Sequence, residues 1–143
     1  MTIKSLLFVL VISFLMVPLF AADRAIDKDT RRFLDAIRRV ETGSLPNAGV
    51  GAIGDKGASI GPYQIQRGYH ADARMKAGRY EDCSTSASYS EQVMLAYFAR
   101  YAPKALEAKD WETLARVHNG GPKGHTKKAT LGYWSKVQKE MAK

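Results

Sequence analysis

A glycine-rich segment over residues 44–70 limits what this chain can fold into more than any other feature. Its glycines and prolines interrupt every apolar period longer than a few residues. These residues are Gly49, Gly51, Gly54, Gly57, Gly61, Gly68, Pro46 and Pro62. Both residue types disfavour helix interiors, so no long helix is expected to cross this segment. Only residues 59–66 look extended. The segment is therefore expected to be either a flexible surface excursion or a loop that carries a site.

The sequence on both sides of this segment has helical periodicity. Apolar residues recur at offsets of three and four between residues 27 and 40, where Asp29 or Thr30 is placed to cap the helix start and Gly43 to end it. A capping-box pattern over residues 88–91 predicts the start of a second helix. Both predicted helices are amphipathic, so each is expected to bury one face.

Two more helices are predicted towards the C-terminus. One covers about residues 104–118, with Asp110 placed to restart it as an N-cap, and the last begins at about Leu131. The chain has 143 residues, 45% of them hydrophobic, which suits one compact domain and argues against disorder. We therefore predict a mainly α (α+β) domain of about four to six helices, with a short strand or loop region over residues 44–70.

The first residues predict export. Lys4 precedes an apolar run over residues 6–17, which is followed by Pro18 and small residues. Such a run is shorter than the roughly 20 residues of a membrane span and matches a secretory signal, although an uncleaved N-terminal anchor is the alternative reading. We predict a signal peptide over residues 1–22, a folded domain over 23–143, and secretion to an extracellular or periplasmic location.

Cysteine content and charge restrict how this domain is stabilised and what it meets. Small exported domains are usually stapled by disulfides, yet Cys83 is the only cysteine, so the fold must depend on packing without an intrachain disulfide. A buried or idle thiol is the expected state of Cys83, and pairing with a cysteine of another chain is the alternative. The net charge of +8 implies attraction to polyanions: nucleic acid, an anionic membrane or an acidic wall polymer.

Glu41 is the first candidate for acid–base chemistry. On a continued helix it lies on the same face as Leu34 and Ile37, in the last turn. Partial burial and the negative end of the helix dipole would both raise the pKa of its carboxyl, as a general acid requires near neutral pH. The alternative is an exposed glutamate in a frayed helix end.

Asp55 is the second candidate. It stands in a turn-like segment, residues 54–57, with polar neighbours that should keep it ionised. Glycoside hydrolysis uses such a contrasting pair, one protonated acid for the leaving oxygen and one carboxylate to attack or stabilise the sugar cation. Asp-Lys-Gly is also an ordinary turn sequence, so a purely structural Asp55 stays open.

Several motifs in the same order carry a resemblance to a known family. They are residues 40–43 (Val-Glu-Thr-Gly), 55–65 (ending Gly-Pro-Tyr-Gln-Ile), 115–124 (containing His-Asn-Gly-Gly-Pro) and 132–134 (Gly-Tyr-Trp). Over about residues 31–140 the chain resembles the invertebrate-type lysozyme, or destabilase, family. The resemblance implies a lysozyme-like, mainly α fold and cleavage of the β-1,4 bond between N-acetylmuramic acid and N-acetylglucosamine in peptidoglycan.

The resemblance also implies roles for particular residues. Glu41 matches the family's proton donor and Asp55 its nucleophile. Substrate binding would fall to Ser59, Tyr63, Gln66, Tyr69, His70, Asp72, Tyr97, His118, Asn119 and Gly120. The chain departs from the family in lacking its disulfide cysteines, since Ile60 and His125 stand at usual cysteine positions. Asp55 also lies one residue closer to Gly61 than the family pattern has it.

Three function classes follow from these features. The first is a secreted muramidase that uses Glu41 and Asp55, and its close variant is a lytic transglycosylase or other enzyme that needs only Glu41. The second is a non-enzymatic, cationic protein that binds an anionic bacterial surface. Nucleic-acid binding ranks third and is not expected, because the aromatic residues fall on predicted core faces.

No metal or cofactor is expected to assist this chemistry. His70, His118 and His125 show no compact ligand spacing. Ser59 is a further candidate for a hydrolase nucleophile, but no Gly-x-Ser-x-Gly elbow surrounds it. The carboxylates therefore remain the leading candidates for catalysis.

Overall fold

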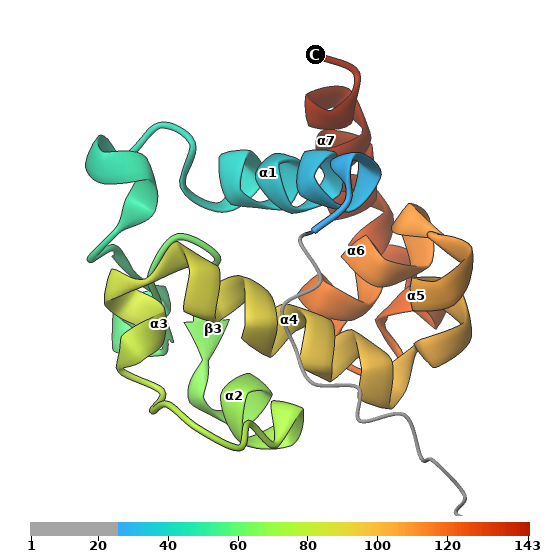
Figure 1. The fold of residues 1–143 in the computed structure, drawn as a ribbon. Coiled ribbons are helices and arrows are strands. Elements are labelled where there is room, and N and C mark those ends of the chain that lie inside the picture. The colour runs from blue at the N-terminus through green and yellow to red at the C-terminus, as the bar shows by residue number, and fades with distance from the viewer. Residues whose placement is uncertain (1–25) are drawn as a thin grey trace, which may run out of the picture.

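The computed structural model describes residues 26–143, so the predicted signal peptide lies outside the described residues. Within them the chain forms seven α-helices and a small sheet (Figure 1). The helices are α1 (Lys28–Thr42), α2 (Arg67–Ala73), α3 (Asp82–Thr85), α4 (Ala87–Tyr101), α5 (Pro103–Ala108), α6 (Trp111–Gly120) and α7 (Leu131–Met141). The mainly α prediction is confirmed. None of the described helices is long and apolar enough to cross a membrane.

Helix starts differ from their predicted caps in two places. Asp27, not Asp29 or Thr30, caps α1, because its side chain accepts hydrogen bonds from the backbone N–H groups of both those residues. The cap of α4 is Ser86, whose hydroxyl accepts from the backbone N–H of Tyr89, so the predicted capping box over residues 88–91 is wrong. In each case the cap lies two or three residues earlier than the pattern indicated.

The predicted helix over residues 104–118 is divided in two. Lys109 has a left-handed backbone conformation, which ends α5. Asp110 then caps α6 as predicted, since its side chain accepts from the backbone N–H of Thr113. This division and the short helices α2 and α3 bring the number of described α-helices to seven, against the four to six predicted.

The glycine-rich segment folds into a short antiparallel sheet. Its strands are β1 (Ile53–Gly54), β2 (Ser59–Ile60) and β3 (Ile65–Gln66), with Ile60 paired to both Ile53 and Ile65. Gly61 at the β2–β3 turn has φ +75°, and a Cβ there would lie 1.8 Å from the carbonyl oxygen of Cys83. Only glycine fits, so the turn packs directly on α3 and is not a loose excursion.

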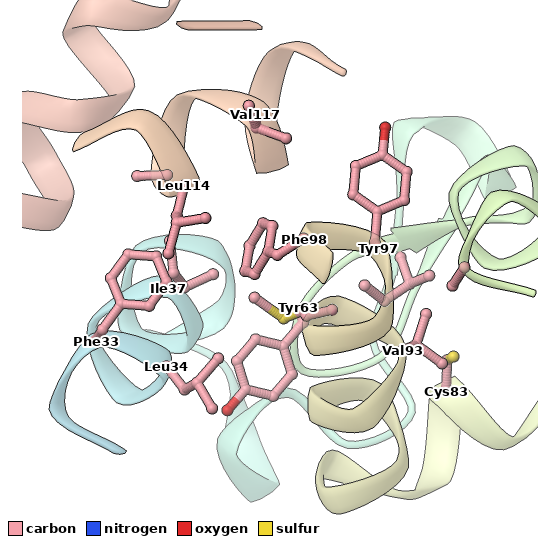
Figure 2. Packing of buried hydrophobic residues seen from close by; sticks show 14 of the residues in the cluster. Phe33, Leu34, Ile37, Tyr63, Cys83, Val93, Tyr97, Phe98, Leu114 and Val117 are labelled. Carbon is pink, nitrogen blue, oxygen red and sulfur yellow. The ribbon is translucent and has the colours of Figure 1, made fainter. Parts of the chain in front are cut away.

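One hydrophobic core holds the helices together (Figure 2). The apolar face of α1 packs against α7, and α4 contacts α2, α3, α5 and α6 (Figure 1). Trp111 stacks on Phe33 with ring centroids 4.8 Å apart. Residues with no exposed surface include Leu34, Ile37, Cys83, Val93, Met94, Phe98, Leu114, Val117 and Val137. This core therefore stabilises the domain without an intrachain disulfide, as its single cysteine requires.

A buried carboxylate ties three parts of the fold together. Glu91 on α4 is 6% exposed and accepts two hydrogen bonds from the guanidinium of Arg31 on α1, at 2.6 and 2.9 Å. The hydroxyl of Tyr63 donates to the same carboxylate at 2.6 Å. Tyr63 was expected to bind substrate, but it is fully buried in the core. Because a buried charge must be paired, Arg31 and Tyr63 satisfy Glu91.

Replacing Tyr63 tests this buried network. Tyr63→Phe removes one of the two hydrogen bonds to Oε1 of Glu91 and leaves this buried carboxylate with the half-exposed Arg31 as its partner. We therefore expect the free energy of unfolding to fall by about 1–3 kcal/mol. Urea unfolding followed by circular dichroism measures it. Tyr101→Phe is the matched control, because the Tyr101 hydroxyl has no hydrogen-bond partner among residues 26–143. Equal stability of the two variants would contradict the role of the Tyr63–Glu91 hydrogen bond.

Candidate active site

One cavity of about 540 Å³ lies between the end of α1, the small sheet, α2, α4 and the end of α6. It brings together eight of the site residues predicted from the sequence, which are far apart along the chain. These are Glu41, Asp55, Gln66, Tyr69, Tyr97, His118, Asn119 and Gly120. The remaining lining residues are Gln64, Gly68, Gly121 and Lys127.

Glu41 lies in the last turn of α1, and its carboxyl is held at one oxygen. The hydroxyl of Tyr133 on α7 donates a hydrogen bond of 2.6 Å to Oε1. Nε2 of His118 on α6 lies 3.6 Å from the same oxygen. Oε2 has no hydrogen-bond partner within residues 26–143. Every fully buried side-chain oxygen of these residues does have a partner. Oε2 is therefore not fully buried, and Glu41 lines the cavity.

The pKa of Glu41 differs from the sequence-based expectation. Burial acts to raise it, as predicted, but the neighbouring His118 and Tyr133, together with the charge of Lys136, outweigh burial and lower the pKa below its usual value. Each of these groups stabilises the ionised carboxylate. His118 acts on this carboxyl both through a hydrogen bond and through its charge, and the charge effect requires a protonated imidazole. The expected rise was wrong because all three groups come from other helices.

Asp55 stands in a strained turn and lines the same cavity as Glu41. It is exposed and opens the 3-10 helix η2 (Asp55–Gly57), where Asp55 and Lys56 have φ values of 48° and 55°. Left-handed backbone is costly for a non-glycine residue and is commonly retained at functional sites. The Asp55 side chain therefore projects from a turn that the surrounding sheet must hold in place.

Ser59 supports Asp55 instead of lining the cavity. Its hydroxyl is 3.1 Å from Oδ2 of Asp55 and 2.9 Å from Oε1 of Gln64, and its side chain is buried. The amide of Gln64 donates to the carbonyl oxygen of Gly61 at 2.9 Å, which points its oxygen towards Ser59. A hydroxyl has one proton to donate, so Asp55 and Gln64 share Ser59. The predicted contact of Ser59 with substrate does not fit this placement.

Two tyrosines form an aromatic wall of the cavity. The rings of Tyr69 on α2 and Tyr97 on α4 are stacked, with centroids 3.7 Å apart and 13° between the planes. The Tyr69 hydroxyl lies 3.2 Å from Nδ1 of His118. Because this contact occupies one ring nitrogen of His118, it turns the other towards Glu41. Burial raises the pKa of Tyr69, so its hydroxyl stays protonated at neutral pH.

Two further predicted residues lie outside the cavity. Nε2 of His70 is 2.8 Å from the hydroxyl of Tyr89. The carboxylate of Asp72 lies 3.9 Å from the guanidinium of Arg100. Neither residue lines the cavity, so the structure does not bring them to the site as the resemblance implied.

Tyr133 is a site residue whose role could not be predicted from the sequence. It lies four residues before the core residue Val137, so helical spacing puts both on the buried face of α7. That spacing was the available signal, but it does not say which side chain Tyr133 meets. Among residues 26–143, no group of three or more His, Cys, Asp or Glu side chains is arranged to hold a metal ion.

Comparison with known proteins adds to this geometry. A family model described as Destabilase matches residues 32–140. Lysozyme 1 of Crassostrea virginica is 34% identical over 110 residues, which is 76% of this chain but only 58% of that relative's length. The lysozyme of Meretrix lusoria is also 34% identical, over 77% of this chain and 88% of its own.

Solved structures of lysozymes have a fold similar to that of this chain. The crystal structure of Meretrix lusoria lysozyme in complex with Aeromonas hydrophila PliI matches with a TM-score of 0.64 and 31% identity, over 83% of this chain and 93% of that one. Tapes japonica lysozyme matches with a TM-score of 0.64 and 30% identity, over 76% and 88%. Since the family model covers most of the described residues and the fold agrees, this chain belongs to the Destabilase family, and it has the lysozyme fold.

Proposed function

We propose that this chain is a secreted muramidase that hydrolyses the β-1,4 bond between N-acetylmuramic acid and N-acetylglucosamine in bacterial peptidoglycan. The observation that carries the proposal is the pair Glu41 and Asp55, which line one cavity from contrasting surroundings. Similarity to proteins named lysozyme supports it. The net charge of +8 favours approach to an anionic bacterial surface, and the predicted signal peptide would export the enzyme to it.

Glu41 is the proposed general acid, and its proton is carried on Oε2. Tyr133 already occupies Oε1, so Oε2 is the oxygen that can protonate the glycosidic oxygen of a bound strand. A glycan in the cavity would displace water from Oε2. This additional burial would act to raise the pKa of Glu41, in the direction opposite to the lowering found in the free enzyme.

Asp55 is the proposed nucleophile. Its exposed carboxylate lines the same cavity as Glu41, where it would attack or stabilise the anomeric carbon as the leaving sugar departs. Water would then complete hydrolysis with Glu41 acting as the base. Retention of anomeric configuration would follow if the two carboxyl groups operate about 5 Å apart.

Replacing Glu41 tests its proposed role as the general acid. Glu41→Gln keeps the side-chain shape but removes the acid, so we expect clearance of a peptidoglycan suspension to fall by about a hundredfold or more. Glu107→Gln is the matched control, because Glu107 is exposed on α5 and does not line the cavity. If Glu41→Gln cleared the suspension as fast as the unmodified protein, Glu41 would not be the acid. If this variant still killed bacteria and added salt suppressed the killing, the non-enzymatic, cationic function would be favoured instead.

The pH profile of activity tests how Tyr133 affects the pKa of Glu41. Tyr133→Phe removes a hydrogen bond that stabilises the ionised form of Glu41, so it raises the pKa of that carboxyl. A general acid works while protonated, so the alkaline fall of kcat/KM should begin about one pH unit higher. Rates on a soluble glycan between pH 4 and about pH 9 measure this. A profile reduced equally at every pH, or one shared by Tyr101→Phe, would contradict control of the Glu41 pKa by Tyr133.

A lytic transglycosylase is the second candidate, because Glu41 is the more buried of the two carboxyls and Asp55 is exposed. Such an enzyme needs only one acid, so it would keep its activity in Asp55→Asn. Muramidase action predicts instead a loss of at least about a hundredfold. Mass analysis of the released muropeptides separates the two: hydrolysis gives reducing ends, and transglycosylation gives anhydro ends.

A further inference from the structure

The cavity has an uneven distribution of charge. Two of its lining residues, Glu41 and Asp55, are acids, and Lys127 is the only lysine or arginine among the described residues that line it. A ligand that carries its own carboxylate would be repelled by the two acids unless a cation received it. His118 lies against Glu41, so among the described lining residues Lys127 is the cation left to receive it. Lys127 has no role in the proposed catalytic steps.

The main chain of Lys127 is fixed in place. Its N–H donates to the carbonyl oxygen of Gly124 at 3.0 Å, and its own carbonyl oxygen accepts from the guanidinium of Arg116 at 3.3 Å. The backbone N–H of Thr130 donates to the same carbonyl oxygen at 3.2 Å. Thr130 is 3% exposed and accepts a further bond from Arg116. The backbone of Lys127 is therefore held in place beside the end of α6.

The side chain of Lys127 is also directed to the cavity. Nζ donates a hydrogen bond of 2.5 Å to the carbonyl oxygen of Gly120, the last residue of α6. The carboxyl end of a helix attracts cations, so this contact holds the ammonium at the rim. The stem passes close to Gly120, since a Cβ on that glycine would lie 3.6 Å from Cδ of Lys127.

The ammonium has donors left for a ligand. An ammonium group has three N–H donors, and the bond to Gly120 uses one. No acidic side chain among residues 26–143 forms an ion pair with Lys127. Two donors and a full charge therefore face the cavity mouth without an internal partner.

We propose that Lys127 is a specificity-determining residue that binds a carboxylate carried by the glycan, so that the cavity selects acidic glycan strands over neutral polymers of N-acetylglucosamine. This inference rests on the proposed function and names the feature of the substrate that is recognised. In a peptide-free strand the carboxylate is that of the lactyl group on N-acetylmuramic acid. In a peptide-bearing strand the lactyl group is amidated, and the carboxylates belong to the peptide.

Binding measured in a Glu41→Gln background tests the proposal, because the ligands then stay intact. Three probes are titrated calorimetrically: neutral chitotetraose, a peptide-free tetrasaccharide of alternating N-acetylglucosamine and N-acetylmuramic acid, and the same tetrasaccharide with its stem peptides. Lys127→Met keeps the stem and removes the charge. Lys128→Met is the matched control, since Lys128 is the next residue, is exposed and does not line the cavity.

We expect Lys127→Met to weaken binding of an acidic probe by about threefold to tenfold and to leave chitotetraose within about twofold. Lys127→Arg should restore the preference, Lys128→Met should not change it, and added salt should reduce it. Whichever acidic probe responds identifies the lactyl or the peptide carboxylate. Equal weakening of all three probes, no weakening of any, or binding of none would overturn the proposal.

Failure of the proposed function would look different. If the unmodified protein released no products from peptidoglycan but still preferred acidic probes through Lys127, hydrolysis would be excluded and carboxylate recognition would stand. If it cleaved peptidoglycan and Lys127→Met bound every probe unchanged, hydrolysis would stand and the inference on Lys127 would fall.

Discussion

The carboxyl of Glu41 is held where the ends of α1 and α6 meet α7. The hydrogen bond from Tyr133 links residues 92 positions apart along the chain, so the proposed acid is placed only when α7 has packed on α1. His118 reaches the same oxygen from α6. No disulfide staples these helices, because the chain has one cysteine. The geometry of the site therefore depends directly on the hydrophobic core that joins α1, α6 and α7.

Features set by neighbouring residues could be predicted from the sequence, and features set by distant residues could not. The spacing of apolar residues located α1, α4 and α7, and Asp110 was identified as a cap because capping depends on residues three apart. Glu91 was interpreted locally, as part of a capping box. Its actual partner Arg31 is 60 residues away, and a buried ion pair of that kind leaves no periodic signal.

The pKa of Glu41 shows the same division. Burial and the helix end were both apparent from its position in the sequence, and both act to raise the pKa. The groups that reverse the shift, led by His118 and followed by Tyr133, arrive from other helices. For the cavity, resemblance to the family predicted more than helical periodicity did, because it named eight of the lining residues. It also named Tyr63, whose hydroxyl satisfies Glu91 in the core.

The glycine-rich segment carries its part of the site because it is rigid. Its turn at Gly61 fits against the carbonyl of Cys83 with no room for a side chain, and this contact fixes the sheet on α3. The Cys83 thiol is buried there, and burial raises its pKa to about 11, so its role is packing, not chemistry. A fixed sheet can hold Asp55 in a left-handed turn that an unsupported loop would relax. The lone cysteine thus belongs to the contact that keeps the proposed nucleophile in position.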